Sequence, residues 1–347
     1  MAVQKFLFVP VSSPKGVGEY MRSQAVAKKL QRDNPDADIA FVLSAEAPYH
    51  KDCPFKVFLT PQSPTKHSSM VNKVMDEFQP QLVLFDASGR VAQFRHAKAI
   101  GAKTVFTCQH NAKVRRGMRL RRWRYTDEIW RVQAHGASAS YSSWQRLKSK
   151  ILNKPLPIPI GPIFPLPEPE KEDTLLHKHG LQKNNYLIVS SGSGGHYVEG
   201  KNAQETFNEA ALIFANKHKL ETRVVFGPNY SGSAIKQGYC ASVSTLEGGE
   251  FVTLLGSAKL ALISAGSTLF QCASLGVQNV SVSVAGDQAE RLEWCEQRNL
   301  TTGAAFDVNA IVSALESINE QPQKIDRTLV ENGLITAVNR MKNLVGE

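Results

Sequence analysis

The stretch LALISAGSTLFQCASLGVQNVSVS, residues 260–283, contains a complete strand–helix–strand pattern. Its first four residues form a continuous apolar run, which together with Ser264 predicts a buried strand. Gly266 interrupts the pattern, residues 267–275 predict a helix, and residues 279–283 predict a second strand. A helix between two apolar strands is typical of a parallel sheet that helices cover on both faces.

The same alternation continues along the rest of the chain. Further strands are predicted at residues 5–10, 39–43, 81–86, 103–107, 128–132, 186–191 and 222–227. Further helices are predicted at residues 21–31, 203–219, 288–298, 308–318 and 331–345. We therefore predict an α/β fold of two doubly wound, Rossmann-like domains. Ligands of such sheets bind beyond the carboxyl ends of the strands, so we expect the two domains to face a cleft.

A proline-rich segment separates the two halves. Residues 155–169 (PLPIPIGPIFPLPEP) contain seven prolines, a density that excludes a helix or a central strand. We predict an N-terminal domain over residues 1–157, a linker over 158–172 and a C-terminal domain over 173–347. The length of 347 residues agrees with two domains of about 100–200 residues each.

Several classes of protein are disfavoured by composition. No apolar run approaches the ~18–20 residues of a membrane span, and the first residues lack the pattern of a signal peptide. The five cysteines are scattered without a CxxC pair, which fits neither a disulfide framework nor a zinc site. We expect a cytoplasmic protein that needs no metal ion and no other cofactor.

The net charge of +10 is unevenly distributed. Residues 1–160 hold 26 Lys and Arg against 11 Asp and Glu, whereas residues 161–347 hold 15 against 20. The basic half is therefore the half that we expect to meet an anionic partner. Its densest part is residues 113–124 (KVRRGMRLRRWR), with seven basic residues and no acid.

Two small-residue loops follow predicted strands. In the first, Gly16 and Gly18 allow close backbone approach before a helix whose N-terminus attracts anions. Glu19 at that position fits either a reactive carboxylate or an acid that complements the helix dipole. The second loop is SSGSGGH, residues 190–196, whose backbone N–H groups suit a phosphate. His196 fits a phosphate or sugar ligand and an exposed loop residue about equally well.

Motifs in both halves resemble those of GT-B glycosyltransferases. Residues 16–22 (GVGEYMR) are similar to the family's G-x-G-H-x-x-R loop. Residues 264–271 (SAGSTLFQ), residues 275–277 (LGV) and Gln288 are similar to its donor-domain motifs G-G-S/A-T-x-x-E, L-G-x-P and x-x-Q. Within that family, these motifs resemble those of the lipid-II-forming N-acetylglucosaminyltransferase and of the UDP-sugar hydrolase of pseudaminic acid synthesis.

The sequence departs from this pattern at two positions. Glu19 occupies the place of the family's histidine, and a carboxylate can likewise deprotonate an acceptor hydroxyl. Glycosyltransferases that add octulosonic acid sugars also carry a glutamate base in a small-x-Gly-Glu loop. Gln271 occupies the place of the glutamate that binds the ribose, which removes a charge-assisted hydrogen bond. The donor is therefore not assumed to be UDP-N-acetylglucosamine.

The resemblance implies an inverting, metal-independent glycosyltransferase that uses a nucleotide-sugar in polysaccharide or glycolipid assembly. Glu19 and Arg22 are its expected catalytic residues. The expected donor or phosphate ligands are Gly16, Gly18, Ser191, Gly192, Ser193, Gly194, His196, Gly266, Ser267, Thr268, Gln271 and Gln288. A nucleotide-sugar hydrolase of the same fold and a non-catalytic protein that binds a sugar nucleotide or a polyanion are the alternatives. No binding of nucleic acid is expected.

The acceptor is expected on the basic N-terminal half. The residues assigned to the acceptor or to an anionic surface are Asp86, His110, Arg115, Arg116, Arg119 and Arg122. Asp86 fits a helix cap as well, and the role of His110 is open. For residues 113–124 we expect contact either with an acidic saccharide or with an anionic membrane, where Met118, Leu120 and Trp123 would enter the lipid interface.

Overall fold

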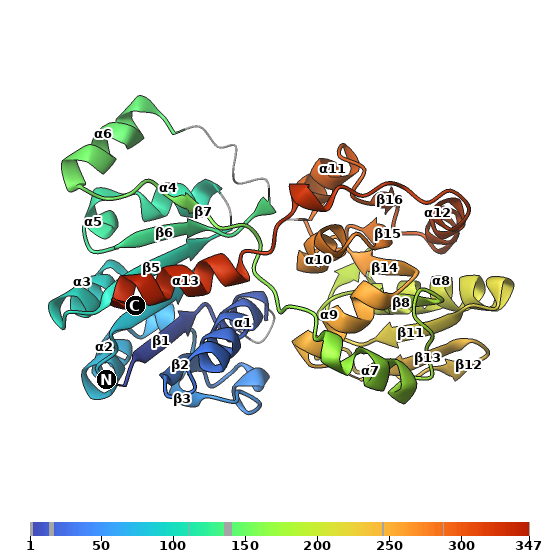
Figure 1. Ribbon diagram of the computed structural model, residues 1–347, viewed down its shortest axis with the longest axis horizontal. Coiled ribbons are helices and arrows are strands. Elements are labelled where there is room, and N and C mark those ends of the chain that lie inside the picture. Colours follow the sequence, from blue (N-terminus) through green and yellow to red (C-terminus); the bar gives the residue numbers. More distant parts are fainter. Residues whose placement is uncertain are drawn as a thin grey trace. The chain divides into compact units, whose positions relative to one another are not determined.

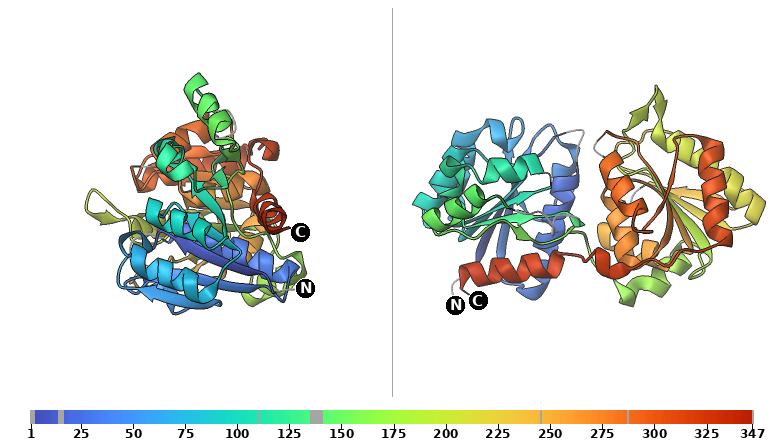
Figure 2. Two further views of the ribbon diagram at one scale, coloured as in Figure 1. Left: turned by 90° about the vertical axis from the view of Figure 1, so that its left-hand side faces the viewer. Right: turned by 90° about the horizontal axis from the view of Figure 1, so that it is seen from above.

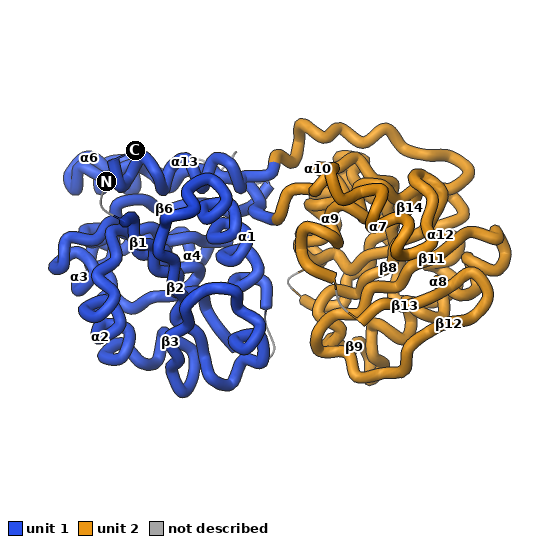
Figure 3. The backbone as a smooth tube through the Cα atoms, turned by 60° about the horizontal axis from the view of Figure 1, so that its bottom comes forward, with its two compact units in different colours: residues 1–164, 332–347 blue, residues 165–331 orange. Residues whose placement is uncertain are grey.

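The computed structural model describes residues 3–13, 17–109, 111–134, 141–244, 246–286 and 288–346. The chain divides into two compact units (Figure 3). Residues 1–164 and 332–347 form the N-terminal unit, and residues 165–331 form the C-terminal unit. Each unit is a parallel-dominated sheet between helices, so the predicted fold of two Rossmann-like α/β domains is confirmed (Figures 1 and 2).

The N-terminal sheet is entirely parallel. Its strands lie in the order β3 (Lys56–Thr60), β2 (Asp38–Ser44), β1 (Lys5–Pro10), β4 (Leu82–Asp86), β5 (Lys103–Cys108), β6 (Glu128–Arg131) and β7 (Ile158–Pro159). The chain leaves β1 toward β2 and later returns to β4 on the other side. The switch point of the sheet, where ligands usually bind, is therefore between β1 and β4.

Helices cover both faces of this sheet. On one face lie α2 (Ser68–Phe78), α3 (Val91–Ala99), α4 (Asn111–Gly117) and α5 (Leu120–Trp123), whose apolar side chains form one core with the strands. On the other face α1 (Gly18–Asp33) packs beside α13 (Leu334–Val345). Helix α6 (Ser143–Leu152) stands at the margin of the unit (Figure 1).

The C-terminal sheet has the order β12 (Lys236–Gln237), β13 (Cys240–Val243), β11 (Glu221–Val225), β8 (Tyr186–Ser190), β14 (Leu260–Ser264), β15 (Gln278–Val282) and β16 (Thr302–Ala304). Only the edge strand β12 pairs antiparallel in this sheet. A separate two-stranded ribbon joins β9 (Tyr197–Val198) and β10 (Lys201–Asn202). The switch point lies between β8 and β14.

Helices also flank the C-terminal sheet on both faces. Helices α8 (Ala203–His218) and α12 (Val308–Glu320) pack on each other and share one apolar core with the strands. On the opposite face lie α7 (Glu172–Lys178), α9 (Gly248–Ser257), α10 (Ser267–Leu275) and α11 (Ala289–Glu296). Short 3-10 segments occur at Pro48–His50, Pro64–Lys66, Pro169–Lys171 and Arg327–Leu329.

Two features differ from the predicted domain boundaries. The start of the predicted linker is the edge strand β7, which pairs with β6. Helix α13, predicted in the C-terminal domain, belongs to the N-terminal unit. It buries Leu334, Ala337, Val338 and Met341 there, and the Arg340 guanidinium donates to both carboxylate oxygens of Glu128 in β6, at 2.7 and 2.8 Å. An apolar stripe and a bidentate ion pair hold this helix on the sheet.

Candidate functional site

Two glycine turns meet at the switch point of the C-terminal sheet. One follows β8 at residues 191–195, and the other follows β14 at Gly266. Gly192 has a φ of +87°, a conformation that favours glycine, and a Cβ there would lie 3.1 Å from the Oγ of Ser264. The two loops are therefore in contact at the carboxyl ends of adjacent strands.

The loop after β8 is held by the surrounding chain. The Ser191 hydroxyl donates to Oε1 of Gln204 at 2.6 Å, and the Ser193 carbonyl accepts a hydrogen bond from the N–H of Asn229 at 2.9 Å. The side-chain amide of Asn202 donates to the Gly194 carbonyl at 3.2 Å. The buried Ser191 side chain thus bonds to the protein, which leaves the backbone as the part of this loop that suits a ligand.

The chain after β11 lies directly beneath this loop. A Cβ on Gly227 would lie 2.1 Å from the carbonyl oxygen of Gly192, so only glycine fits there. Among the described residues, no hydrogen bond is found from the N–H groups of Ser193, Gly194 or Gly195. His196 follows these residues directly in the sequence. Its backbone carbonyl accepts a hydrogen bond from the N–H of Ala203, and the residue is half-buried.

Helix α10 begins at the second turn without a side-chain cap. Gly266 is its N-cap, and among the described residues no side-chain hydrogen bond caps the first turn. Ser267 is exposed and Thr268 is half-buried in that turn. An uncapped N-terminus leaves N–H groups and a partial positive charge available to an anion.

Two glutamines lie near this N-terminus. Gln271 is one turn into α10, and its buried Oε1 has no hydrogen-bond partner among the described residues. Gln288 is buried, accepts the N–H of Val284 at 2.9 Å, and has its Nε2 3.8 Å from the place of a Cβ on Gly266. Both glutamines thus lie near the start of α10, and their predicted contact with a donor stays a prediction. Asp287, which directly precedes Gln288, lies outside the described residues.

Arg291 lies next to this turn, and its place there was not predicted from the sequence. Its Nη1 donates to the Ala265 carbonyl at 2.6 Å, and its guanidinium lies 5.6 Å from the ring centre of Phe270. The only sequence signal was its position three residues after Gln288 at the start of a predicted helix. It adds a positive charge beside the start of α10.

In the N-terminal unit, Arg22 and Asp86 bind each other at the switch point. Arg22 donates from Nε and Nη2 to the two carboxylate oxygens at 2.9 and 2.6 Å, and Ser23 donates to Asp86 at 3.1 Å. Burial alone would lower the pKa of Arg22, but the Asp86 carboxylate outweighs it and raises that pKa. Both side chains are buried, which differs from the predicted contacts of Arg22 with ligands and of Asp86 with an acceptor.

Glu19 lies in the first turn of α1, next to a lysine from another element. Lys113 Nζ in α4 is 3.8 Å from Glu19 Oε1, and the Glu19 side chain is 20% exposed. No atom of the described residues lies within 4 Å of the place that a Cβ on Gly18 would take. Gly16 and His110, predicted to take part in the site, lie outside the described residues.

The basic run is split between two short helices and is partly buried. Arg115 and Arg119 are exposed and Arg116 is half-buried, as a surface for anions requires. Arg122 is 4% exposed, which corrects its predicted surface role. Its guanidinium lies over the rings of Phe94 and Phe106, and burial lowers its pKa to about 10.

The prediction that Met118 and Trp123 enter a lipid interface is wrong, because both are buried in the core. Leu120 is 47% exposed. No helix in the described part of the chain is long and apolar enough to span a membrane. The described residues also contain no group of three or more His, Cys, Asp or Glu side chains that could hold a metal ion.

Arg131 at the end of β6 was also missed. It is 3% exposed, its Nη2 donates to the side-chain carbonyl of Asn111 at 3.1 Å, and its Nε has no partner among the described residues. The charges of Arg22 and Lys113 are matched by Asp86 and Glu19, whereas that of Arg131 meets only a neutral amide in the described chain. This edge of the sheet therefore carries an excess positive charge.

Solved structures of known proteins share this fold across nearly the whole chain. The calicheamicin glycosyltransferase CalG4 is 13% identical with a TM-score of 0.63, over 100% of this chain and 99% of that one. The UDP-GlcNAc 2-epimerase from Neisseria meningitidis, solved bound to UDP-GlcNAc, is 12% identical with a TM-score of 0.61, over 98% and 100%. UGT89C1 of Arabidopsis thaliana is 11% identical with a TM-score of 0.58, over 99% and 97%.

No protein-family model and no curated sequence matches this chain. The structural matches show that its fold is the one shared by GT-B glycosyltransferases and UDP-N-acetylglucosamine 2-epimerases. The predicted resemblance in fold is confirmed. At these identities the matches establish the fold alone, and the reaction is a separate question.

Proposed function

We propose that this protein is an inverting, metal-independent glycosyltransferase. It transfers a sugar from a nucleotide-sugar to a glycolipid or surface-polysaccharide acceptor on the cytoplasmic side of a membrane. The observation that carries the proposal is the pair of glycine turns at the β8–β14 switch point, one of which opens the uncapped helix α10. This arrangement suits the diphosphate of a sugar nucleotide.

The donor is assigned to the C-terminal unit. Its diphosphate accepts hydrogen bonds from the backbone at Gly266, Ser267 and Thr268, and Ser193 and Gly194 approach the phosphate or sugar. A ribose hydroxyl donates to Oε1 of Gln271, which supplies the partner that this buried atom lacks within the described part of the chain. Gln288 lies beside the Gly266 turn and supports it, and the positive charge of Arg291 stabilises the negative charge of the leaving diphosphate.

Glu19 is assigned the role of general base. Its carboxylate takes the proton from the attacking acceptor hydroxyl while the bond from the anomeric carbon to the diphosphate breaks. Lys113 orients this carboxylate, and Arg22 with Asp86 fixes the first turns of α1 beneath it. The exposed Arg115 and Arg119 attract an anionic acceptor.

A thermal-shift panel with UDP-, GDP-, CMP- and dTDP-sugars tests the donor site. Selective binding raises the melting temperature of the folded protein, and we expect one nucleotide class to do so. A lack of any shift would contradict the proposal. The stabilising donor is then incubated with saccharide and glycolipid acceptors, and the products are identified by mass spectrometry.

The products separate the alternatives. Free sugar released at the same rate with and without acceptor identifies a nucleotide-sugar hydrolase. An altered donor sugar with its nucleotide still attached identifies an epimerase, the reaction named for several of the matched structures. Donor binding without turnover on any acceptor identifies a binding protein.

A further inference from the structure

Helix α6 carries an apolar stripe that the described chain does not cover. Trp144, Leu147 and Ile151 recur at the i, i+3, i+7 spacing that places side chains on one side of a helix. They are 58%, 46% and 67% exposed, and no residue of α6 is buried. Large apolar side chains that gather on one exposed face mark an interaction surface rather than a solvated helix.

Basic residues border this stripe, and acids are absent from it. Lys148 lies on one side of the stripe and Lys150 on the other, by their positions along the helix, with Arg146 further round. The Lys148 ammonium lies 5.2 Å from the ring centre of Trp144. Residues 141–159 contain no Asp or Glu. Helix α6 therefore presents an apolar stripe, and its own charged side chains are all basic.

The opposite side of α6 is fixed to the N-terminal unit. Leu152 and Tyr141 pack against the unit's apolar core, and the side-chain amide of Gln145 donates to the Met118 sulfur at 3.5 Å. The contact with Met118 places α6 beside the basic run, where Arg119 is exposed. Figure 1 and the left-hand view of Figure 2 show α6 standing out from the rest of this unit.

We propose that α6 docks the protein on an anionic lipid bilayer. Trp144, Leu147 and Ile151 enter the boundary between headgroups and acyl chains, while the neighbouring lysines bind lipid phosphates. A second copy of the chain fits the stripe less well, since a stable protein interface takes roughly 20–30 residues a side. The cationic border favours anionic over neutral lipid.

This inference agrees with a membrane-bound acceptor in the proposed function but is tested separately from it. Donor binding requires no lipid, so the thermal shift with a nucleotide-sugar and the binding to vesicles succeed or fail independently. A protein that binds vesicles and no sugar nucleotide would retain the docking surface and lose the proposed reaction.

Co-sedimentation of the full chain with vesicles provides the test. We expect binding to vesicles of phosphatidylglycerol and phosphatidylcholine in equal parts, and much weaker binding to phosphatidylcholine alone. The triple variant Trp144→Ser, Leu147→Ser, Ile151→Ser is expected to bind at least about tenfold more weakly, because it has lost the apolar side chains that move from water into the lipid. The pair Lys148→Glu and Lys150→Glu is expected to abolish the preference for phosphatidylglycerol.

Matched controls separate docking from folding. Ile335→Ser changes an isoleucine that is 50% exposed on α13 of the same unit, and it is expected to bind like the wild type. Melting curves establish that each variant is folded. Lipids brominated in their acyl chains are expected to quench wild-type tryptophan fluorescence, and Trp144→Phe to lose that quenching. Equal binding by the triple variant and the wild type would overturn the proposal, and so would a wild type that binds neither kind of vesicle. A wild-type dimer that becomes a monomer in the triple variant would also overturn it, because the stripe would then be an interface between two copies of the chain.

Discussion

Arg22 of α1 and Asp86 of β4 form a buried bidentate ion pair that joins the helix following β1 to the end of β4, at the N-terminal switch point. The Nη2–Oδ1 distance is 2.6 Å and the Nε–Oδ2 distance is 2.9 Å. Thr107 also donates to Asp86, so three elements meet at one carboxylate. The pair fixes α1, and with it the Glu19 carboxylate three residues earlier, relative to the sheet.

We predict that Asp86→Ala destabilises the N-terminal unit by about 3–5 kcal/mol, because it leaves the Arg22 charge buried without a partner. Denaturant unfolding, followed by a probe in that unit, measures the loss. The exposed Asp36→Ala is the control and should change little. The double variant Arg22→Met with Asp86→Leu should recover much of the stability, and if it is as unstable as Asp86→Ala, the buried charge is not the cause.

Glu19→Gln should lower kcat by about 10²–10⁴-fold, the usual contribution of a general base. Its affinity for the donor should stay the same, because the donor ligands are assigned to the C-terminal unit. Transfer kinetics and donor-induced thermal shifts measure the two quantities. The control is Glu46→Gln, an exposed glutamate of the same unit. Full turnover by Glu19→Gln would exclude this residue as the base.

Gly227→Ala should weaken donor binding and destabilise the C-terminal unit by roughly 1–3 kcal/mol, the cost of overpacking. The new Cβ would lie 2.1 Å from the Gly192 carbonyl oxygen and displace the loop after β8. Gly286→Ala is the matched control, since a Cβ there meets nothing within 4 Å. Melting curves with and without donor report both effects. An unchanged donor shift in Gly227→Ala would separate this loop from the donor site.

Gln271→Leu should reduce donor affinity about five- to tenfold through the loss of one hydrogen bond. The free protein should be no less stable than the wild type, because the substitution removes a buried oxygen that has no partner in the described chain. Gln271→Glu should bind the donor more tightly through a charge-assisted bond to a ribose hydroxyl.

Isothermal titration with the donor identified by the thermal-shift panel measures these affinities. Gln237→Leu, which replaces an exposed glutamine of the same unit, is the control. If Gln271→Leu binds the donor like the wild type, Oε1 of Gln271 does not contact it.

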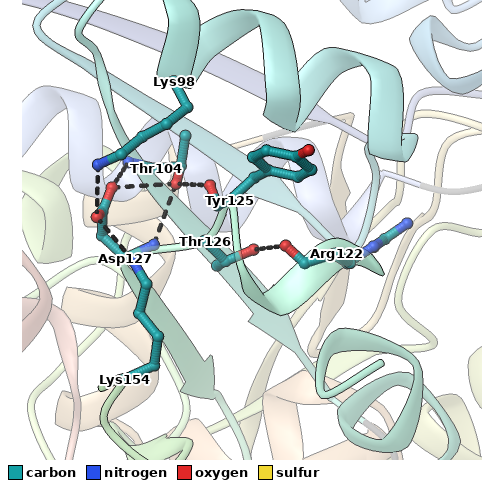
Figure 4. Close-up of polar contacts among 7 residues, drawn as sticks. All are labelled: Lys98, Thr104, Arg122, Tyr125, Thr126, Asp127 and Lys154. Atoms are coloured by element: carbon teal, nitrogen blue, oxygen red, sulfur yellow. Dashed lines mark hydrogen bonds and ion pairs between the residues drawn. The ribbon is translucent and has the colours of Figure 1, made fainter. Parts of the chain in front are cut away.

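The contacts of Asp127 lead us to predict that the stability of the N-terminal unit depends on pH (Figure 4). Burial raises the pKa of its carboxyl, but the N–H of Thr104 at 2.9 Å and the ammonium groups of Lys98 and Lys154, each at 3.2 Å, outweigh burial and lower it. The folded state thus holds the ionised form more strongly than the unfolded chain does. This stability is present above the ordinary pKa of 3.8 and is lost as the pH falls through the lower folded value.

Asp127→Asn should therefore be less stable at neutral pH and should lose less stability on acidification. Unfolding free energies between neutral pH and pH about 3 measure the slope. The exposed Asp36→Asn is the control and should keep the wild-type slope. An identical slope in Asp127→Asn and the wild type would contradict the assigned ion pairs.

Local patterns in the sequence predicted the central strands of both sheets and the helices α1, α8, α10, α11, α12 and α13, whereas α2–α7 and α9 were not predicted. The helix at residues 267–275 was predicted with the bounds of α10, because glycines stand at both of its ends. Strand β3 was missed, since its apolar run is only three residues long (Val57 to Leu59) and none of the three is buried. The amphipathic pattern of α13 predicted a helix, but an apolar stripe does not specify which sheet it covers.

The site was less predictable than the fold, because its contacts are long-range. Arg22 and Asp86 are 64 residues apart in sequence, and neither carries a local sign that the other will bind it. The charge of residues 113–124 concealed the burial of Arg122 over two phenylalanine rings from other elements. The glycine loops after β8 and β14 were easier to predict, because each is a local feature that follows a strand. They lie side by side because β8 and β14 are paired in the sheet.

The return of helix α13 to the N-terminal unit determines when each unit can fold during synthesis. The C-terminal unit is one continuous segment, complete once residue 331 has left the ribosome. The N-terminal unit begins first but keeps part of one sheet face bare until residues 334–345 are made. Although domains generally fold in order from the N-terminus, here the unit that is translated first is the last to be completed.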